Sequence, residues 1–568
     1  MKLFRFFFLL VFLCRPMTAV EPASIYRITG VVISSVDETP VAHAHLNAVL
    51  TGRGQQVNRF ASGISAEADE HGRFTVTLPS AGAWRLTANA AGYVNQAYEE
   101  HDGYSSAVVL SAATPTIDLH FRLSPEATIT GAVLDEAGEA VRDARVTLQR
   151  RAAASPDREV QPFQNRMMGQ TDDRGIYEFA NLSAGDYRIM VDAKPWYSQS
   201  SQPRSTISPS SDAPLPDPTL DVTYQLTWYP GVDVPEQAEI LSLKAADSRR
   251  ADFHMVPIPA VHLQFTLPTN QESQGGRSMP LFPVLDRIDT GSNGSGIAPG
   301  RGSTVLANSQ QEHFDIGGLA PGLYRMRIQG QDRSTQTSII EINPGSSRLV
   351  DASTMSAQIA NIAINFDSGE EGFPSGVELK NAETGQRFTL SDTNIFLPAN
   401  VRRGPQSRTP QQTNLQVPPG RYEVGLMGRG NFYLTGITGK GVEISGRFIT
   451  VPAGDITLTL HAARGHATVN GIATADGKPV VGAMVLLVPA GLDDPNSFTI
   501  LVRDQTNTDG SFDLSGIVPG PYILVAVDHG WAINWRDPST LQRYLMQGVP
   551  LDLHAGANLK QDITAQAP

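Results

Sequence analysis

Residues 171–191 read TDDRGIYEFANLSAGDYRIMV, a stretch with two alternating runs that each follow turn-forming residues. Apolar residues recur at every second position in both runs, which is the pattern of a half-buried β-strand. Aspartate and glycine before the first run, and glycine before the second, are typical of turns. The stretch therefore predicts a β-hairpin, although two aspartates beside a glycine also suit a metal loop or an acid/base pair.

The predicted hairpin is repeated along the chain at a fixed spacing. In the intact copies, one glycine is followed by a second glycine ten residues later and by an aromatic residue twelve residues later. These copies are Gly72, Gly82 and Trp84; Gly175, Gly185 and Tyr187; and Gly510, Gly520 and Tyr522. Two degraded copies keep only the second glycine and its aromatic residue, Gly322 with Tyr324 and Gly420 with Tyr422.

Each hairpin belongs to a larger unit of short strands. Two predicted strands joined by a turn precede it, as in ITGAVLDEAGEAVRDARVTLQ at 129–149 and VNGIATADGKPVVGAMVLLV at 469–488. Helical periodicity is confined to a short run at 539–546. We therefore predict an all-β protein with about five tandem β-sandwich domains, strung like beads. The predicted boundaries are 21–124, 125–257, 258–354, 355–463 and 464–568, after a signal peptide at 1–20.

The full repeat reads G-x-V-x-D-x-x-G-x-x-V-x-x-A-x-V-x-L, then T-D-x-x-G-x-[FY]-x-[FL]-x-x-[LIV]-x-x-G-x-Y. This pattern resembles the carboxypeptidase regulatory-like domain. It is carried by 129–192 and 469–527, more loosely by 28–93, and only at the hairpins between 258 and 463. The resemblance implies an Ig-like, transthyretin-like (prealbumin-type) β-sandwich for each unit. The whole chain resembles exported bacterial proteins built only of such repeats.

The N-terminal segment MKLFRFFFLLVFLCRPMTAV has the features of a secretory signal peptide. Lys2 and Arg5 precede an apolar core of eight residues, which is too short to span a hydrocarbon layer of ~30 Å. We therefore expect an exported protein of the periplasm, cell surface or extracellular space, without stable membrane insertion after cleavage. The only cysteine, Cys14, lies in this segment, so the exported chain has no disulfide. The formal net charge of −13 argues against a nucleic-acid partner, which needs a basic face.

The resemblance does not bring peptidase chemistry with it. In metallocarboxypeptidases a separate catalytic domain holds zinc through an H-x-x-E pair and a distant histidine. None of the twelve histidines of this chain has glutamate three residues later, and neither H-E-x-x-H nor G-x-S-x-G is present. We therefore predict a protein that is not an enzyme, with no catalytic residue, no cofactor and no metal site.

Three aspartates in predicted turns and one pair of histidines are the candidate metal ligands of the chain. Asp69, Asp172 and Asp509 precede the first glycine of a repeat, but the stretch closest to a calcium loop fails at both ends. We therefore interpret them as turn formers, because their side chains bond the backbone of a turn. His43 and His45 share one predicted strand face, which favours a solvated surface over a metal site. The aromatic residue of each hairpin is predicted to fill the core or to latch a corner.

Aromatic residues outside the repeat positions are the candidates for glycan stacking. They are Trp196, Tyr197, Trp228, Tyr229, Trp531 and Trp535. Their rings could stack on sugars if they are exposed, whereas the other interpretation is that they close the ends of their sandwiches.

We predict a non-catalytic exported multi-domain binding or scaffold protein of the cell envelope or extracellular space. Its partner would be an unknown polysaccharide or envelope protein, bound through loops and sheet edges with avidity from several modules. The alternative is a carbohydrate-binding protein that uses exposed aromatic residues on its sandwich domains. Glycan binding needs a coplanar exposed aromatic pair, whereas a scaffold leaves these rings buried.

Overall fold

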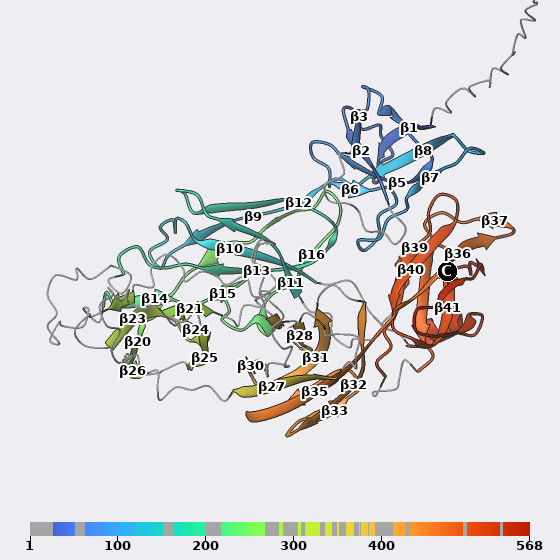
Figure 1. The fold of residues 1–568 in the computed structure, drawn as a ribbon. Coiled ribbons are helices and arrows are strands. Elements are labelled where there is room, and N and C mark those ends of the chain that lie inside the picture. The colour runs from blue at the N-terminus through green and yellow to red at the C-terminus, as the bar shows by residue number, and fades with distance from the viewer. Residues whose placement is uncertain are drawn as a thin grey trace, which may run out of the picture.

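The computed structural model of the chain is built almost entirely of short strands (Figure 1). It describes residues 26–51, 63–151, 163–198, 217, 219–266, 283–287, 305–307, 313–329, 335–343, 349–351, 359–367, 374, 376–383, 386–391, 413–427, 431–491, 497–533 and 538–568. The predicted signal peptide lies outside these residues. Within them, no helix is long and apolar enough to cross a membrane.

Unit 1 is a sandwich of two sheets. One has the order β4-β1-β8, and the other has the order β3-β2-β5-β6 with β7 also paired to β5. Ile28, Leu46, Leu86 and Phe121 are among the side chains buried between them. The strands are β1 (Tyr26–Ser34), β2 (His45–Leu50), β3 (Ile64–Glu67), β4 (Arg73–Leu78), β5 (Gly82–Asn89), β6 (Gln96–Ala97), β7 (Val108–Leu110) and β8 (Thr116–Leu123).

Unit 2 packs the sheet β12-β9-β17, with β18 also on β9, against the sheet β11-β10-β13-β15, with β16 also on β13. A separate pair, β14 with β19, follows at its end. The strands are β9 (Ala127–Leu134), β10 (Arg145–Arg151), β11 (Phe163–Gln170), β12 (Ile176–Leu182), β13 (Gly185–Asp192), β14 (Val222–Tyr224), β15 (Thr227–Trp228), β16 (Leu241–Leu243), β17 (Ser248–Arg250), β18 (Phe253–His254) and β19 (Pro257–Pro259), with the 3-10 helix η2 (Pro235–Gln237).

Units 3 and 4 repeat the two-sheet plan. Unit 3 has the sheets β22-β23-β20-β26 and β21-β24-β25, and unit 4 has β30-β27-β35-β32 and β29-β28-β31-β34-β33. The strands of unit 3 are β20 (Val261–Thr266), β21 (Pro283–Arg287), β22 (Val305–Ala307), β23 (His313–Leu319), β24 (Gly322–Gln329), β25 (Thr335–Ile342) and β26 (Leu349–Asp351). The strands of unit 4 are β27 (Ala360–Asp367), β28 (Gly376–Asn381), β29 (Arg387–Ser391), β30 (Thr413–Val417), β31 (Gly420–Met427), β32 (Phe432–Lys440), β33 (Glu443–Ser445), β34 (Phe448–Val451) and β35 (Gly454–Arg464).

Unit 5 packs the sheet β37-β36-β40, with β43 and β44 also on β36, against the sheet β39-β38-β41-β42. Its strands are β36 (Ala467–Ala475), β37 (Lys478–Pro479), β38 (Met484–Pro489), β39 (Val502–Gln505), β40 (Ser511–Ile517), β41 (Gly520–Val527), β42 (Val549–Leu553), β43 (Asn558–Lys560) and β44 (Ile563–Thr564), with the 3-10 helix η5 (Gly530–Ala532). The helix α1 (Pro538–Leu545) confirms the one predicted helix, and its Leu541 and Tyr544 pack on the outside of β38 and β41. Five two-sheet units within the described residues confirm the predicted all-β tandem array.

The opening stretch does not form the predicted hairpin. Its two strands, β12 and β13, pair in different sheets of unit 2, β12 with β9 and β13 with β10. Residues 183–184 therefore carry the chain across the sandwich as an arch, and the other four copies also join strands of different sheets. The alternating pattern is the same for a hairpin and an arch, because each strand buries one face in either case.

The aromatic residue of each copy fixes its arch from inside. Its side chain donates a hydrogen bond to the backbone carbonyl four residues earlier. The pairs are Trp84 with Ser80 (3.3 Å), Tyr187 with Ser183 (2.7 Å), Tyr324 with Ala320 (2.8 Å), Tyr422 with Pro418 (2.7 Å) and Tyr522 with Val518 (2.7 Å). All five rings are buried, which confirms the predicted core and corner role. Burial raises the pKa of Tyr422 to about 12, so its hydroxyl remains a donor at neutral pH.

A further repeated glycine lies in the first strand of three units. A β-carbon on Gly30, Gly131 or Gly471 would lie 2.0, 1.8 or 2.0 Å from a backbone carbonyl oxygen of the adjoining C-terminal segment of its own unit. That segment runs parallel to the first strand, as β8 does beside β1. Only a residue without a β-carbon lets the two backbones approach this closely.

Replacing Gly131 with alanine should therefore destabilise unit 2 by about 1–3 kcal/mol, the usual cost of overpacking. The added methyl group would meet the carbonyl oxygen of Ala251 and push β17 and β18 away from β9. Faster amide hydrogen exchange in β9 would report this change. Gly425→Ala is the matched control, because a β-carbon there would meet its neighbours only at ordinary contact distances. Equal exchange in both variants would contradict the prediction.

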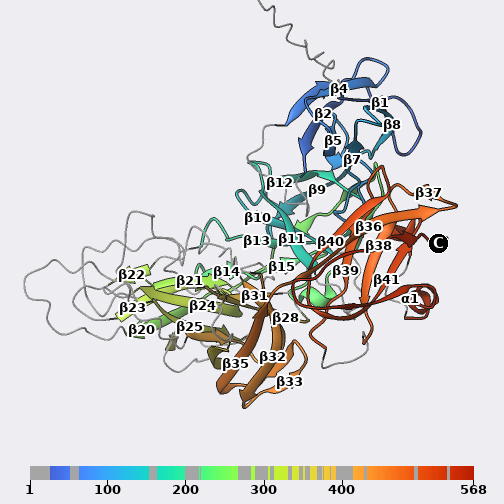
Figure 2. The ribbon, with the colours of Figure 1, turned by 45° about the vertical axis from the view of Figure 1, so that its right-hand side comes forward.

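The units are not separate beads, because each neighbouring pair makes contact. Unit 1 bonds unit 2 through Asn95 N–H and Asn181 Oδ1 (3.3 Å), and His262 of unit 3 bonds the buried Asp221 of unit 2 (3.0 Å). The chain also doubles back, so that units 1 and 5 lie side by side although they are its two ends (Figures 1 and 2). The predicted beads-on-a-string arrangement is therefore wrong for this chain.

Candidate functional site

The contact between units 1 and 5, called the junction below, joins residues 99–109 to residues 503–508 and η5. The backbone of the two units bonds directly. Thr508 N–H donates to Ala107 O (3.0 Å), and Val109 N–H donates to Thr508 Oγ1 (2.8 Å). Ala107 N–H donates to Asn507 Oδ1 (2.8 Å). The turn before β40 thus adds its polar groups to the strand edge that leads into β7.

Buried polar side chains complete the junction. Ser106, Gln505 and Thr506 are each 0% exposed. Ser106 Oγ donates to Thr506 O (2.7 Å), and the Gln505 amide donates to Ser106 Oγ (2.9 Å) and also to Glu99 O. Buried groups that bond each other across two surfaces fix one relative orientation, because any shift leaves them unsatisfied.

Trp531 anchors the outer side of the junction. Its ring lies parallel to His101 at 5.7 Å and stacks on Tyr104 at 5.3 Å. Its indole N–H donates to Gly482 O (3.1 Å), which holds the ring on unit 5. The Arg503 guanidinium lies 5.2 Å from the Tyr104 ring centre and 5.9 Å from that of Trp531, within the range of cation–π contacts.

One residue difference between the repeats adapts the unit 5 turn to this contact. In units 1 and 2, Asp69 and Asp172 lie three residues before the glycine, and their carboxylates accept hydrogen bonds from backbone N–H groups of their own turns. Unit 5 has Asn507 at this position. Its Oδ1 accepts the Ala107 N–H of unit 1 instead, and its amide donates to Ser511 Oγ (3.0 Å).

The predicted turn role is thus confirmed for Asp69 and Asp172. Hydrogen bonds from the backbone of each turn hold the pKa of both carboxyls below the usual value. The largest contribution comes from the Arg73 N–H for Asp69 and from the Ile176 N–H for Asp172. Asp509 also bonds its own turn, through the Ser511 N–H (3.0 Å). These aspartates are therefore engaged by their own turns.

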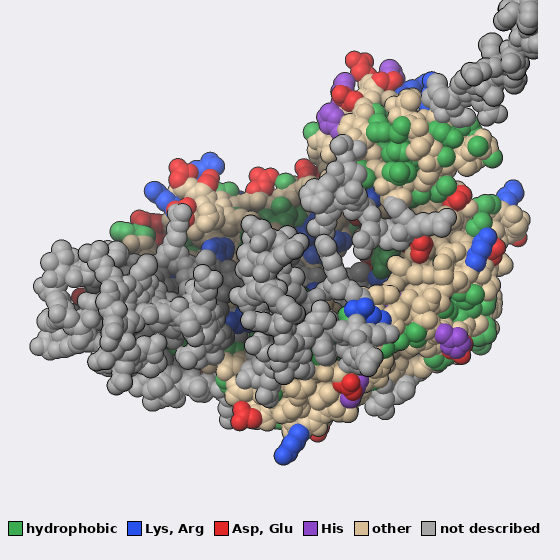
Figure 3. Space-filling model, viewed as in Figure 1, with side chains coloured by type: hydrophobic (Ala, Val, Ile, Leu, Met, Phe, Trp, Pro, Cys, Tyr) green, Lys and Arg blue, Asp and Glu red, His purple; other side chains and the backbone are tan. Residues whose placement is uncertain are grey.

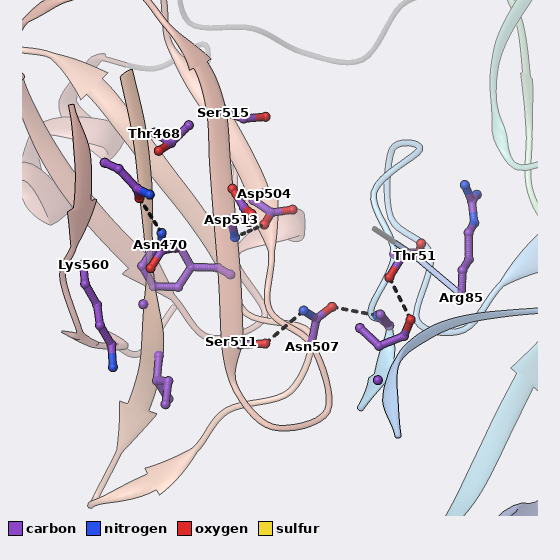
Figure 4. Close-up of a pocket in the computed structure, with 18 of the residues that line it drawn as sticks. Thr51, Arg85, Thr468, Asn470, Asp504, Asn507, Ser511, Asp513, Ser515 and Lys560 are labelled. Carbon is purple, nitrogen blue, oxygen red and sulfur yellow. Dashed lines mark hydrogen bonds between the residues drawn. The ribbon is translucent and has the colours of Figure 1, made fainter. Parts of the chain in front are cut away.

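A cleft of about 1240 Å³ opens beside the junction (Figure 4). Thr51 and Arg85 of unit 1 lie on one side, and Asn470, Asp513 and Lys560 of unit 5 lie on the other. The unit 5 wall is the outward face of β36, β40 and β43, so its side chains are the solvent-facing set of that sheet. The cleft exists only while the junction holds the two units together.

The walls of the cleft offer hydrogen-bonding groups of both kinds. Asn470 Nδ2 donates to Asn558 Oδ1 (3.0 Å), which leaves the other half of each amide available to a ligand. The Nε atom of Arg85 is buried and has no hydrogen-bond partner within the described residues. Arg85 is also one of the residues that line the cleft, so an arginine side chain adds a charged group to this wall. The cleft therefore has the chemistry of a binding site for a polar molecule.

The described residues contain no group of three or more histidine, cysteine, aspartate or glutamate side chains that could hold a metal ion. Acidic and histidine side chains gather on the outer end of unit 1 (Figure 3). His43 and His45 are both exposed, but His43 lies in the turn before β2 instead of on its face. His43 bonds Glu67 at 3.2 Å. This surface is solvated, as predicted.

The aromatic pair nearest to the glycan-stacking hypothesis is Trp196 with Tyr197. Trp196 is 78% exposed. The two rings meet edge to face, at an angle of 90°, so they do not form one flat platform. The Tyr197 hydroxyl donates to Glu136, which fixes this ring on unit 2. Stacking on a sugar by Trp196 and Tyr197 stays a prediction, with Trp196 alone offering an open face.

Trp228 and Tyr229 lie inside unit 2 and offer no open platform. Trp228 is 1% exposed and packs with Met190 and Leu226, while the Arg188 guanidinium covers its ring at 4.6 Å. Burial lowers the pKa of Arg188 to about 10. Tyr229 is partly buried and packs edge to face on Phe253 at 5.9 Å. The glycan-stacking hypothesis for Trp228 fails on this burial, and both residues close the end of the sandwich.

Of the last candidate pair, Trp531 and Trp535, the structure describes Trp531 alone. Trp531 is half-buried and its ring is used by the junction, between unit 1 rings and Gly482. Trp535 lies outside the described residues. Sequence reasoning therefore found Trp531 but missed its partner surface. The signal in the sequence that could have indicated the junction is Asn507, because the other two intact copies have aspartate at this position.

Comparison with solved structures finds two pilins and a further bacterial protein, all at low similarity. A streptococcal ancillary pilin is 12% identical, with 58% of this chain and 98% of that chain covered and a TM-score of 0.19. The Bacillus anthracis TIE protein is 9% identical, with 97% and 76% covered and a TM-score of 0.15. GBS52, the minor pilin of Streptococcus agalactiae, is 10% identical, with 44% and 100% covered and a TM-score of 0.20. Values this low assign neither a family nor a function.

No protein-family model matches the chain, and no curated protein matches it.

Proposed function

We propose that this chain is a non-catalytic, exported binding and scaffold protein of the cell envelope or extracellular space. The junction is the observation that carries the proposal. It links residues about 400 positions apart through buried hydrogen bonds, such as Ser106 Oγ to Thr506 O. A contact of this kind serves a protein that must hold several modules in one fixed arrangement. In such an arrangement the loops and sheet faces of different units act together.

We further propose that the partner binds in the cleft beside the junction. Its amides and hydroxyls suit a polysaccharide or a polar segment of an envelope protein, and the Arg85 side chain adds a positive charge to one wall. A ligand that touches both walls would stabilise the closed form, because it binds that form alone. Binding and closure would therefore support each other.

We also propose that the units are carboxypeptidase regulatory-like domains with the boundaries 21–124, 125–257, 258–354, 355–463 and 464–568. The proposal is supported by the repeated arch, with its glycine and its aromatic latch, in all five units. The glycine beside the C-terminal segment supports it in units 1, 2 and 5. The name implies no peptidase activity here, because the chain has neither an H-x-x-E pair nor a G-x-S-x-G motif.

Retention assays on immobilised polysaccharides and envelope fractions test the proposed binding role. We expect the exported protein to be retained by one of them, and Arg85→Ala to lose this retention. Arg27→Ala is the matched control, because Arg27 is an exposed arginine of the same unit. Retained material should be recovered unchanged. Release of hydrolysis products, or equal retention of both variants, would contradict the proposal.

The same assay separates the alternative carbohydrate-binding function. Among the described residues of the predicted set, Trp196 is the exposed one. Loss of polysaccharide retention in Trp196→Ala, with retention kept in Arg85→Ala, would favour stacking by exposed aromatic residues over binding in the cleft.

A further inference from the structure

One position of the repeat is used for contacts between units. It lies eleven residues after the second glycine of each arch, where the eight-residue strand that begins at this glycine has ended. The position holds Tyr93 in unit 1, Trp196 in unit 2, Asn431 in unit 4 and Trp531 in unit 5. In unit 3 it falls on Arg333, which lies outside the described residues. Because the strands are equally long, the position leaves each sandwich at the same end.

In units 1 and 4 this position holds the start of the next unit. Beside Tyr93, Gly92 O accepts a hydrogen bond from the Glu126 N–H (3.0 Å), directly before β9 of unit 2. In unit 4, Asn431 Oδ1 bonds the ring of His466, directly before β36 of unit 5. The two contacts are therefore equivalent, because each holds the residue before the first strand of the following sandwich.

Units 5 and 2 use the position differently. In unit 5, Trp531 reaches a unit far away in the sequence and stacks on Tyr104 of unit 1. In unit 2 the local role has passed to Asp221, whose backbone carbonyl accepts the Ala260 N–H (3.0 Å) directly before β20. Trp196 is thus left without this task, and within the described residues no hydrogen bond or ring contact joins it to another unit.

Trp196 belongs to a small exposed apolar patch at one end of unit 2. It is 78% exposed, and Val256 is 67% exposed. The residue after Trp196 donates its hydroxyl to Glu136, and the residue before Val256 donates its N–H to Leu134 O (2.8 Å). Both segments are therefore fixed at the turn that follows β9. A fixed, exposed indole suits a protein contact, because little conformational freedom is lost when a partner binds.

We propose that Trp196 and Val256 form a docking surface for a second copy of this chain. At the equivalent position, units 1, 4 and 5 all contact a sandwich of this chain, and a second copy offers the same kind of surface. Two copies that meet through the same part of unit 2 form a closed pair with twofold symmetry. Tryptophan is among the residues that contribute most to such interfaces. The proposal does not depend on the cleft or on its ligand.

Sedimentation of the full chain over a range of concentrations tests the pairing. We expect a reversible monomer–dimer equilibrium whose dissociation constant rises about tenfold or more in Trp196→Ala, as for an interface hot spot. Val256→Arg should act in the same direction. Ile240→Ala is the matched control, because Ile240 is a 44% exposed apolar residue of the same unit beside β16, which pairs with the start of β13. A wild-type chain that stays monomeric, or equal dissociation constants with and without Trp196, would overturn the proposal.

Hydroxyl-radical footprinting locates the surface within the wild-type chain, so it does not depend on whether a variant folds. Oxidation of Trp196 should fall severalfold as the concentration rises through the dissociation constant. Oxidation of Met546, which is 74% exposed on unit 5, should stay constant. Unchanged oxidation of Trp196 in the dimer would overturn the proposed surface. Loss of polysaccharide retention in Trp196→Ala with an unchanged dissociation constant would also overturn it and would favour stacking on a sugar.

Discussion

Replacing Ser106 with tryptophan should open the junction and convert the doubled-back chain into an extended one. Ser106 is 0% exposed between units 1 and 5, so there is no room for an indole ring there. The Gln505 amide would lose its bond to Ser106 Oγ, and an unsatisfied buried amide costs about 1–3 kcal/mol. The units themselves should remain folded, because Ser106 lies outside the two sheets of unit 1.

Small-angle X-ray scattering measures this change as a larger radius of gyration and a longer maximum dimension. Circular dichroism checks that the strand content is kept. Ala113→Trp is the matched control, because Ala113 lies in an exposed turn of the same unit. It adds the same ring without reaching unit 5, so its scattering should equal that of the wild type. An unchanged radius of gyration in Ser106→Trp would mean that the junction does not hold the two ends together.

The second large effect is expected at Trp228. Trp228→Ala should destabilise unit 2 by about 3–5 kcal/mol, the usual cost of removing a large buried aromatic side chain. The ring is 1% exposed and fills the space between Met190, Leu226 and the Arg188 guanidinium. Without the ring, Arg188 also loses a cation–π partner while it stays buried.

Hydrogen exchange in β13 and β15 is the suitable measurement, because a five-unit chain does not unfold in one two-state step. Exchange should accelerate in unit 2 and stay unchanged in unit 5. Trp196→Ala is the control, since an exposed side chain contributes within about 0.5 kcal/mol. If Trp228→Ala kept wild-type exchange and lost only polysaccharide retention, Trp228 would be a binding residue and its structural role would be wrong.

The sequence was sufficient to predict the strand content and the repeat. Period-two alternation and the spacing of Gly175, Gly185 and Tyr187 depend on local geometry, which every copy shares. The same local pattern could not separate a hairpin from an arch. In both, the strands alternate and a glycine turns the chain, and only the partners of β12 and β13 distinguish them.

The junction could not be predicted from local patterns. It joins residues 99–109 to residues 503–508, and no periodicity links segments so far apart. Asn507 looks like a conservative change from aspartate in a turn, yet its Oδ1 bonds unit 1. Tryptophans were equally ambiguous. Trp196 and Trp228 both lie near linkers in the sequence, but one is 78% exposed and the other 1%.

The closed arrangement of units 1 and 5 is the central claim, and a distance between them tests it most directly. Spin labels on Ala113→Cys and Val481→Cys would lie on exposed sites of unit 1 and unit 5. Cys14 is the only native cysteine and is replaced by serine in this background. Double electron–electron resonance should give one short, narrow distance distribution, which Ser106→Trp broadens and lengthens. A broad, long distribution in the otherwise unchanged chain would contradict the account, because it would show five domains strung without a junction.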